Sequence, residues 1–313
     1  MALFGWLRRG RRTGDAAALA ERGAGGAVGE ANPLMLIHGR TRTAGVPYAL
    51  PRDMEEINRL DFQHYMLRFA FQGLYAAPIG APASILDVGT GTGRWAIEMA
   101  ELFPAARVVG LDVNPPPPDE RASRGVDMRP PNYQFTPGNI LEGLPFPDGA
   151  FDFVHMRLLF TGMPLDRWPS VIGELARVAR PGGWVESVES ANLLQTGPAF
   201  AQVQTWLNQV VARRGVDIDA AQHVGEWMRA AGLVNIQVFT VNLPTGAYGG
   251  RIGTMMAQDI LSAFNALKGL VAAAGIASES EFDSLLAAAR AELNAPNCRT
   301  VTPFYIAYGQ RPA

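Results

Sequence analysis

The sequence predicts an α/β fold with a doubly wound, mostly parallel sheet, and three observations lead to it. A short apolar run at 85–88 is followed by glycines at every second position and then by a helical pattern. A second buried strand is expected at 107–112, so strands and helices alternate. The alternation continues to residue 243, and after two further helices a last strand is expected at 301–308.

The residues before the first strand are expected to form two segments. Residues 1–31 combine an apolar start, several arginines and a glycine-rich end, which predicts a flexible or partner-docking segment. Residues 32–80 are expected to form an arm, irregular over 38–53 and helical from Asp53, a suitable N-cap. The apolar stripe of that helix predicts packing against the main domain.

The predicted core spans residues 81–245. Its glycine-rich turn lets the backbone reverse tightly, and the N–H groups of the following helix point toward any ligand above the turn. The remaining strands of this core are expected at 132–140, 151–155, 184–189 and 235–243, with helices at 172–180, 199–213 and 221–232.

Residues 246–300 are expected to be a helical insertion before the last strand. Apolar residues recur at helical spacing over 251–274 and 279–293. We expect this insertion and the N-terminal arm to form a lid. The last strand, within 301–313, is expected to return antiparallel and complete a seven-stranded sheet.

The glycine spacing distinguishes between ligands. A dinucleotide-binding turn reads G-x-G-x-x-G, but the third glycine here is Gly93 and position 94 is an arginine. Asp87 precedes Gly89 by two residues, and a carboxylate there attracts a positively charged ligand and repels a pyrophosphate. The pattern D-x-G-x-G-x-G resembles the S-adenosylmethionine (SAM) motif of class I methyltransferases. That resemblance implies a Rossmann-like fold with SAM as cofactor.

Further cofactor contacts are expected at the ends of the next strands. Asp112 ends a strand about 20 residues after the glycine turn, where a carboxylate accepts from both ribose hydroxyls. Asn139 stands where many class I enzymes have an acid beside adenine. Arg157 is suited to the methionine carboxylate, to substrate, or to a surface role. The expected cofactor-binding residues are Asp87, Gly89, Thr90, Gly91, Gly93, Asp112, Val113, Asn139, Ile140, Met156 and Arg157.

Two segments outside the core narrow the resemblance. Residues 48–64 and 302–309 are similar to the fungal LaeA-like methyltransferases, which act in or regulate secondary metabolism. The similarity does not name the substrate. We interpret the chain as a tailoring methyltransferase that O- or C-methylates an apolar small-molecule metabolite, a terpenoid being one option. A SAM-binding regulatory protein and a protein methyltransferase are the alternatives.

The candidate catalytic residues are Glu189 and His64. Glu189 is expected at the carboxyl end of the fifth strand, facing the acceptor as a base or as a partner for developing positive charge. A buried acid can also be structural, held by backbone N–H groups. His64 is the alternative base. The expected substrate-binding side chains are Tyr48, Tyr248, Met255 and Met256, because aromatic rings and flexible thioethers suit apolar ligands.

Composition limits the remaining functions. A net charge of −2 argues against bulk binding of nucleic acid. Cys298 is the single cysteine, so neither an intramolecular disulfide nor a multi-cysteine metal site can form. No apolar run reaches the roughly 18 residues of a membrane span. We therefore expect a cytoplasmic enzyme without a metal, which uses residues 1–31 if it assembles into a homo-oligomer.

Overall fold

The computed structural model describes residues 34–37, 40–43, 49–117 and 129–313. Two short strands, β1 (Leu34–Ile37) and β2 (Arg40–Thr43), pair antiparallel. The expected irregular arm is therefore wrong over β2. Strands of four residues are too short for an alternating pattern to reveal them. The predictions for residues 1–31 and for Tyr48 lie outside the described residues.

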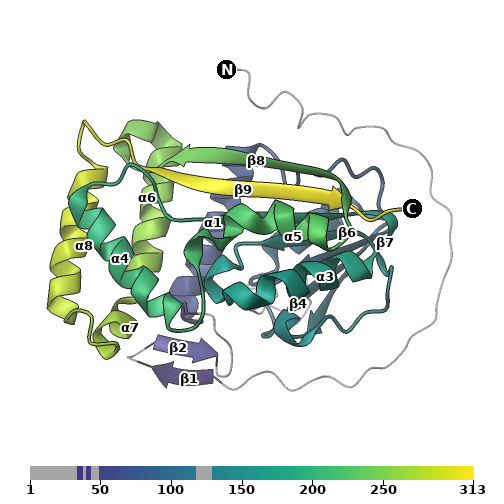
Figure 1. Ribbon diagram of the computed structural model, residues 1–313, viewed down its shortest axis with the longest axis horizontal. Helices are drawn as coiled ribbons and strands as arrows, with labels where there is room; N and C mark the ends of the chain where they lie inside the picture. Colours follow the sequence, from purple (N-terminus) through teal and green to yellow (C-terminus); the bar gives the residue numbers. More distant parts are fainter. Residues whose placement is uncertain (1–33, 38–39, 44–48, 118–128) are drawn as a thin grey trace.

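Seven strands form one sheet in the order β5-β4-β3-β6-β7-β9-β8 (Figure 1). Neighbours from β5 to β7 pair in parallel, whereas β9 runs antiparallel to both β7 and β8. The predicted doubly wound sheet with an antiparallel last strand is confirmed. The strands are β3 (Ser84–Val88), β4 (Arg107–Asp112), β5 (Tyr133–Pro137), β6 (Phe151–Arg157), β7 (Ala179–Ser190), β8 (Val234–Pro244) and β9 (Val301–Gln310).

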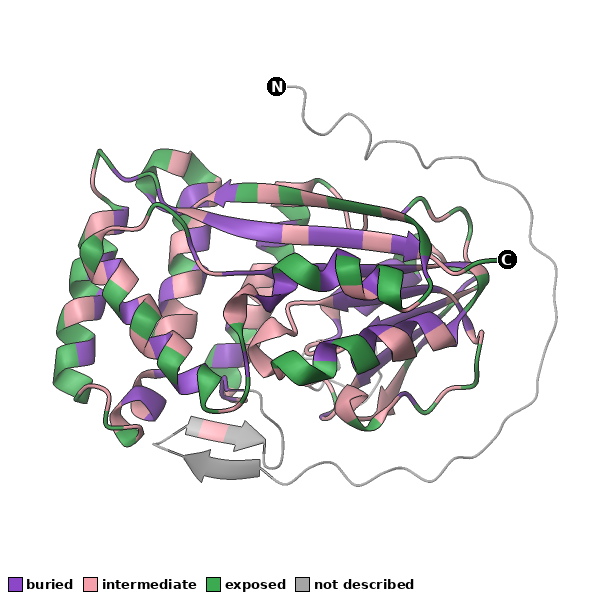
Figure 2. Cartoon of the chain, in the orientation of Figure 1, coloured by how far each residue is buried: buried purple, intermediate pink, exposed green. Residues whose placement is uncertain are grey.

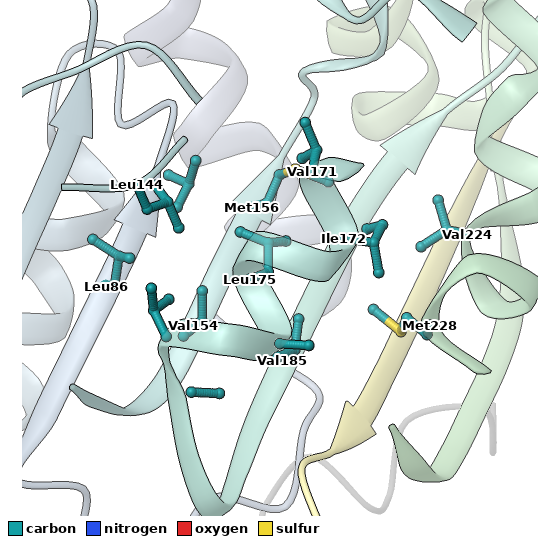
Figure 3. Close-up of a cluster of buried hydrophobic side chains, with 14 of the residues drawn as sticks. Leu86, Leu144, Val154, Met156, Val171, Ile172, Leu175, Val185, Val224 and Met228 are labelled. Atoms are coloured by element: carbon teal, nitrogen blue, oxygen red, sulfur yellow. The ribbon is translucent and has the colours of Figure 1, made fainter. Parts of the chain in front are cut away.

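Helices cover both faces of the sheet. On one face, α3 and α5 pack on β3, β6 and β7 in an apolar cluster (Figure 3). On the other face, α2 packs on β3, β4, β5 and β6, and α1 packs on β7, β8 and β9, in two smaller clusters. The central strands are accordingly buried along most of their length (Figure 2). These helices are α1 (Met54–Phe71), α2 (Arg94–Leu102), α3 (Trp168–Val178) and α5 (Val224–Ala230).

Local sequence signals explain where several helices begin. Asp53 N-caps α1, and its carboxylate accepts from the Glu56 N–H at 3.1 Å, as expected. Ser278 and Glu281 form a capping box at the start of α8. The α3 helix begins earlier than predicted, with a proline in its first turn, and ends at Val178. The segment Arg180 to Gly183 belongs to β7 rather than to the end of that helix.

A helical cap lies at the carboxyl ends of the parallel strands (Figure 1). Its helices are α4 (Pro198–Ala212), α6 (Gly250–Asn265), α7 (Lys268–Ala273) and α8 (Glu279–Leu293), which share a second large apolar cluster. The helix predicted over 251–274 is thus two helices, with a break after Asn265. The α4 helix was expected in the core but packs in this cluster with the insertion. The domain boundaries themselves stay predictions.

Shorter 3₁₀ turns connect these elements. They are η1 (Ile140–Glu142), η2 (Phe160–Gly162), η3 (Leu165–Arg167), η4 (Ile218–His223) and η5 (Ala247–Gly249). Within the described part of the chain, no helix combines the length and apolar character needed to cross a membrane. The described residues also contain no group of three or more His, Cys, Asp or Glu side chains that could hold a metal ion.

Candidate cofactor and substrate site

A cavity of about 330 Å³ lies between the carboxyl ends of the strands and the cap. Its volume falls in the range of roughly 300–1,000 Å³ typical of small-molecule sites. One part of the wall follows β3, β4, β5 and β6, the strands of the predicted cofactor motif. The other part follows β7 and includes one face each of α1, α4 and α6.

The turn after β3 approaches the cavity with bare backbone. The N–H groups of Gly89 and Thr90 donate to the Leu111 carbonyl at 2.8 and 3.0 Å, which ties the turn to β4. Gly89 has φ of +70°, and a Cβ there would lie 2.3 Å from a methyl carbon of Leu159. Only glycine therefore fits this position. Gly89, Thr90 and Gly91 line the cavity, and their contact with the cofactor stays a prediction.

Gly93 has a different role from the one predicted. It is the N-cap of α2 with φ of 79°, and it is not among the residues that line the cavity. Its hypothetical Cβ would lie 3.0 Å from the Tyr133 hydroxyl, so the position admits little more than glycine. Gly93 thus positions α2, whose first residues do reach the cavity.

Asp112 lies at the end of β4 with its carboxylate beside the turn. Its Oδ2 accepts from the Gly91 N–H at 3.0 Å and its Oδ1 from the Asn114 N–H at 3.1 Å. Each carboxylate oxygen retains acceptor capacity for a hydroxyl group. Burial raises the pKa of Asp112, and the nearby Arg52 guanidinium acts in the opposite direction. This geometry suits the predicted ribose contact.

Asp87 lines the cavity while holding two protein groups. Its Oδ2 accepts from the Thr90 hydroxyl at 2.7 Å, and its Oδ1 lies 2.9 Å from His155 Nδ1. The His155 ring stacks on Trp95 with centroids 3.7 Å apart, and burial lowers the pKa of this histidine. A neutral His155 with its proton on Nδ1 donates to Asp87. Asp87 therefore holds the glycine turn in place through its hydrogen bond with Thr90.

Arg157 and His64 meet at the cavity. Arg157 Nη2 lies 3.0 Å from His64 Nδ1, and because a guanidinium can only donate, Nδ1 must accept. Burial, together with the charge of Arg157, lowers the pKa of His64 to about 3. The neutral ring then carries its proton on Nε2, 3.4 Å from the Glu98 carboxylate. Arg157 occupies the lone pair of Nδ1 and Nε2 carries the proton, which leaves His64 no lone pair for a substrate proton.

Glu189 is engaged by backbone groups. Its two carboxylate oxygens accept from the N–H groups of Leu159 and Phe160 at 3.2 and 3.1 Å. The side chain is fully buried and is not part of the cavity wall. Burial raises its pKa to about 8. This arrangement matches the structural alternative, in which Glu189 positions the segment after β6.

The neighbouring acid Glu186 points to the opposite face of β7, as the strand period predicts. Its Oε2 accepts from the N–H groups of Ala76 and Ala77 at 2.7 and 2.6 Å. Its Oε1 lies 4.0 Å from His155 Nε2, so Glu186 extends the row begun by Asp87 and His155 across three strands. Burial raises the pKa of Glu186 to about 7.

Three further predicted site residues, besides Gly93 and Glu189, lie away from the cavity wall. Met156 is fully buried under α3, because side chains alternate along β6 and Arg157 takes the cavity side (Figure 3). Tyr248 is 38% exposed and its hydroxyl donates to the Thr300 carbonyl at 2.7 Å. Met255 packs in the cluster beneath β9. Met256, the next residue along α6, does line the cavity.

Other predicted residues do line the cavity: Val113, Asn139 and Ile140. Asn139 N-caps η1, and its Oδ1 accepts from the Leu141 N–H at 3.1 Å while its amide donates to Glu142. The Oδ1 atom keeps one lone pair for an adenine amino group. The adenine contact of Asn139 stays a prediction.

Several polar side chains of the wall were not predicted from the sequence, and two sets of them stand out. One is Asp259 of α6, which is bound to Arg59 and Gln63 of α1. The other is a pair of asparagines, Asn192 after β7 and Asn208 on α4. Gln204 and Asn208 are four residues apart and so share one helix face, which was a readable signal. Asp259 had no comparable signal within α6, since its partners are about 200 residues away.

The fold and this site define a SAM-dependent methyltransferase. The cavity wall offers hydrogen-bond partners for both parts of SAM, its nucleoside and its methionine part. These partners are the Gly89–Gly91 turn, the Asp112 carboxylate and the Arg157 guanidinium. Residues 85–183 match a methyltransferase domain family. The chain belongs to the class I SAM-dependent methyltransferases.

Three relatives make the relationship more specific. The chain is 31% identical to the N-methyltransferase verN of Clonostachys rogersoniana, over 64% of this chain and 70% of that protein. It is 29% identical to the methyltransferase str2 of Strobilurus tenacellus, over 79% of this chain and 91% of that protein. It is 28% identical to the secondary metabolism regulator LAE1 of Cochliobolus heterostrophus, over 63% of this chain and 66% of that protein.

Proposed function

We propose that this methyltransferase transfers the methyl group of SAM to a nitrogen atom of an apolar small molecule. The observation that carries the proposal is the wall contributed by α4, α6 and the segments after β6 and β7. Its side chains are predominantly apolar, and the two helices cover it, which favours a small molecule over a peptide. Apolar members of this wall are Phe160, Met163, Leu193, Leu207, Val211, Ile218, Met256, Ile260, Phe264 and Leu267.

The acceptor atom follows from the partners of the acids and bases around the cavity. The accepting nitrogen of His64, Nδ1, is bound by Arg157, and Asp259 is bound to Arg59 and Gln63. Asp87 holds Thr90 and His155. Among the described residues of the wall, each of these groups already has a protein partner. An acceptor that needs no base before attack fits this wall best.

A neutral amine meets that requirement. SAM, when bound, supplies a methyl group on a sulfonium, whose sulfur leaves readily. The amine lone pair forms the new N–C bond while the methyl S–C bond breaks and its electron pair stays on sulfur, which leaves S-adenosylhomocysteine. The resulting ammonium loses its proton to solvent afterwards. The chain therefore has to orient the acceptor in line and exclude water, as its apolar wall is suited to do. The name of the relative verN agrees with nitrogen as the acceptor.

The O- or C-methylation expected from the sequence stays a prediction. A hydroxyl acceptor would need a base, and an alkene carbon would need a partner for its developing cation. The relative LAE1 supports a second function, a SAM-binding regulator, for which turnover would be absent. A protein methyltransferase is disfavoured because α4 and α6 cover the cavity.

The test compares three methyl acceptors that share one apolar ring system and differ in the atom that is offered for methylation. We expect 1-aminoindane to receive a methyl group from SAM on nitrogen, whereas 1-indanol and indene react at least tenfold more slowly. Mass spectrometry of the products identifies the methylated atom, and excess S-adenosylhomocysteine (SAH) is the inhibition control. Faster methylation of 1-indanol or indene would contradict the nitrogen assignment. SAH binding without turnover of any of the three would favour the regulatory function.

A further inference from the structure

The α4 helix presents two amide side chains among the apolar groups of the cavity wall. Gln204 and Asn208 lie on the face that also carries Leu207 and Val211. An amide beside an apolar ligand loses its water partners, so it is costly unless the protein or the ligand replaces them. The hydrogen bonds of the two amides show which of them still lacks a partner.

Gln204 is satisfied by the protein. Its Oε1 accepts from the Leu193 N–H at 2.9 Å, and its Nε2 lies 3.4 Å from the Leu193 carbonyl. This side chain therefore holds the segment after β7 against α4. Its hydrogen-bonding capacity is directed at the backbone rather than at a ligand.

Asn208 belongs to a chain of hydrogen bonds that begins at a carboxylate. Asp219 accepts from both the backbone N–H and the Nδ2 of Asn192, at 3.1 and 2.9 Å. The Oδ1 of Asn192 therefore points away from Asp219, and it accepts from Nδ2 of Asn208 at 3.0 Å. This order fixes the orientation of both amides, because a carboxylate can only accept.

The Oδ1 atom of Asn208, at the end of this series of hydrogen bonds, can still accept a hydrogen bond. Within the described part of the chain, Oδ1 of Asn208 has no hydrogen-bond partner, and it is not among the polar atoms sealed in the interior. The Asp219 charge polarises the Asn192 amide, which in turn polarises the Asn208 amide. This polarisation makes Oδ1 of Asn208 a stronger hydrogen-bond acceptor. A ligand group that packs against it must bring an N–H or O–H to avoid a desolvation loss.

We propose that Asn208 is a specificity-determining residue, and that its Oδ1 accepts a hydrogen bond from an N–H or O–H group of the substrate. The inference rests on the proposed function, in which this cavity holds an apolar small molecule. It adds to that function the requirement that the substrate combine an apolar body with a hydrogen-bond donor.

The test compares two probes with the same ring system, indole and 1-methylindole, of which only indole has an N–H group, on the SAH-loaded protein. Dissociation constants are measured by titration, with ¹³C-methyl methionine NMR, in which Met256 reports on the cavity. We expect the wild type to prefer indole by about three- to tenfold, the range of one net hydrogen bond. Asn208→Leu should reduce the ratio to near one while leaving SAH affinity within about twofold.

The matched control is Gln209→Leu, the same loss of an amide at the neighbouring, exposed position of α4. It should retain the preference for indole. If Asn208→Leu does not fold, Asn208→Ala removes the same acceptor and should lose the same preference. Equal affinities in the wild type, or a preference that survives in the variant, would overturn the role of Asn208 alone. Absence of any Met256 shift with either probe would instead contradict the proposed function, and the inference with it.

Discussion

At the residue scale, the two ends of the cofactor site are served by side chains of opposite charge. Asp112 lies at the end of β4, and both its oxygens are ordered by backbone N–H groups. Arg157 lies at the end of β6 and donates to His64, which leaves further guanidinium donors for the cavity. We propose that Asp112 binds the ribose and that Arg157 binds the methionine carboxylate.

A pair of ligands separates these two contacts. SAH contains the ribose and the amino-acid carboxylate, whereas 5′-methylthioadenosine contains only the ribose end. Arg157→Met should weaken SAH by roughly 10- to 100-fold, as expected for a hydrogen bond to a charged group, and leave 5′-methylthioadenosine within about twofold. Asp112→Ala should weaken both ligands. Calorimetry decides, and equal losses of both ligands in Arg157→Met would show that the arginine is merely structural.

At the element scale, a buried ion pair joins α1 of the arm to α6 of the cap. Arg59 Nη1 donates to Asp259 at 2.7 Å, and the same guanidinium binds Glu56 at 2.5 and 2.8 Å. Gln63 adds a hydrogen bond to Asp259 at 2.9 Å. One guanidinium thus compensates two buried carboxylates, and these contacts hold together two neighbouring helices of the cavity wall.

Removing the shared cation should cost more than removing one anion. Arg59→Met leaves two buried carboxylates without it and should lower the free energy of unfolding by about 3–5 kcal/mol. Asp259→Asn keeps the pair with Glu56 and should cost about 1–3 kcal/mol. The control is the exposed pair of Lys268 and Asp283, for which Lys268→Met should cost under about 1 kcal/mol. Urea denaturation measures all three, and a loss in Arg59→Met no larger than in the control would refute the shared-cation account.

At the scale of the whole molecule, buried titratable groups link folding to pH. Burial raises the pKa of Glu186 to about 7 and of Glu189 to about 8. Above an ordinary carboxyl pKa and below these values, the folded chain binds more protons than the unfolded chain. The free energy of unfolding therefore falls as pH rises through this window. His64, with its pKa lowered to about 3, acts oppositely, since its stabilisation is lost as pH falls below about 6.5.

The two effects separate between pH 6.5 and 8, where, of these three groups, the two glutamates still titrate in the folded chain. We expect the free energy of unfolding to fall there by roughly 2–3 kcal/mol, since one group contributes at most about 1.4 kcal/mol per pH unit. Glu189→Gln should flatten this slope, most of all between pH 7 and 8. Urea unfolding at several pH values provides the comparison. A slope that is identical in wild type and variant would show that Glu189 does not titrate in this range.

The local elements and the cofactor motif could be predicted from neighbouring residues alone. The strand, glycine turn and helix at 84–102, the strand that ends in Asp112, and the capped helix α8 are all encoded by neighbouring residues. Such signals act over a few positions, through side-chain period, capping and the freedom of glycine. They were sufficient to identify the fold, SAM and most of the residues around the turn.

The hydrogen-bond partners of the buried polar groups, and the set of helices that forms the cap, became known only from the folded structure. Arg59 and Asp259 are 200 positions apart, Arg157 and His64 are 93 apart, and Glu189 reaches backbone groups about 30 residues earlier. The α4 helix joined the cap because its apolar face matches α6, α7 and α8, which follow it in the chain. An amphipathic pattern predicts that one face of a helix is buried, but it does not predict which segment packs on that face. The partners of a buried acid or base depend on packing between distant segments, and those partners decide whether it catalyses, binds or supports.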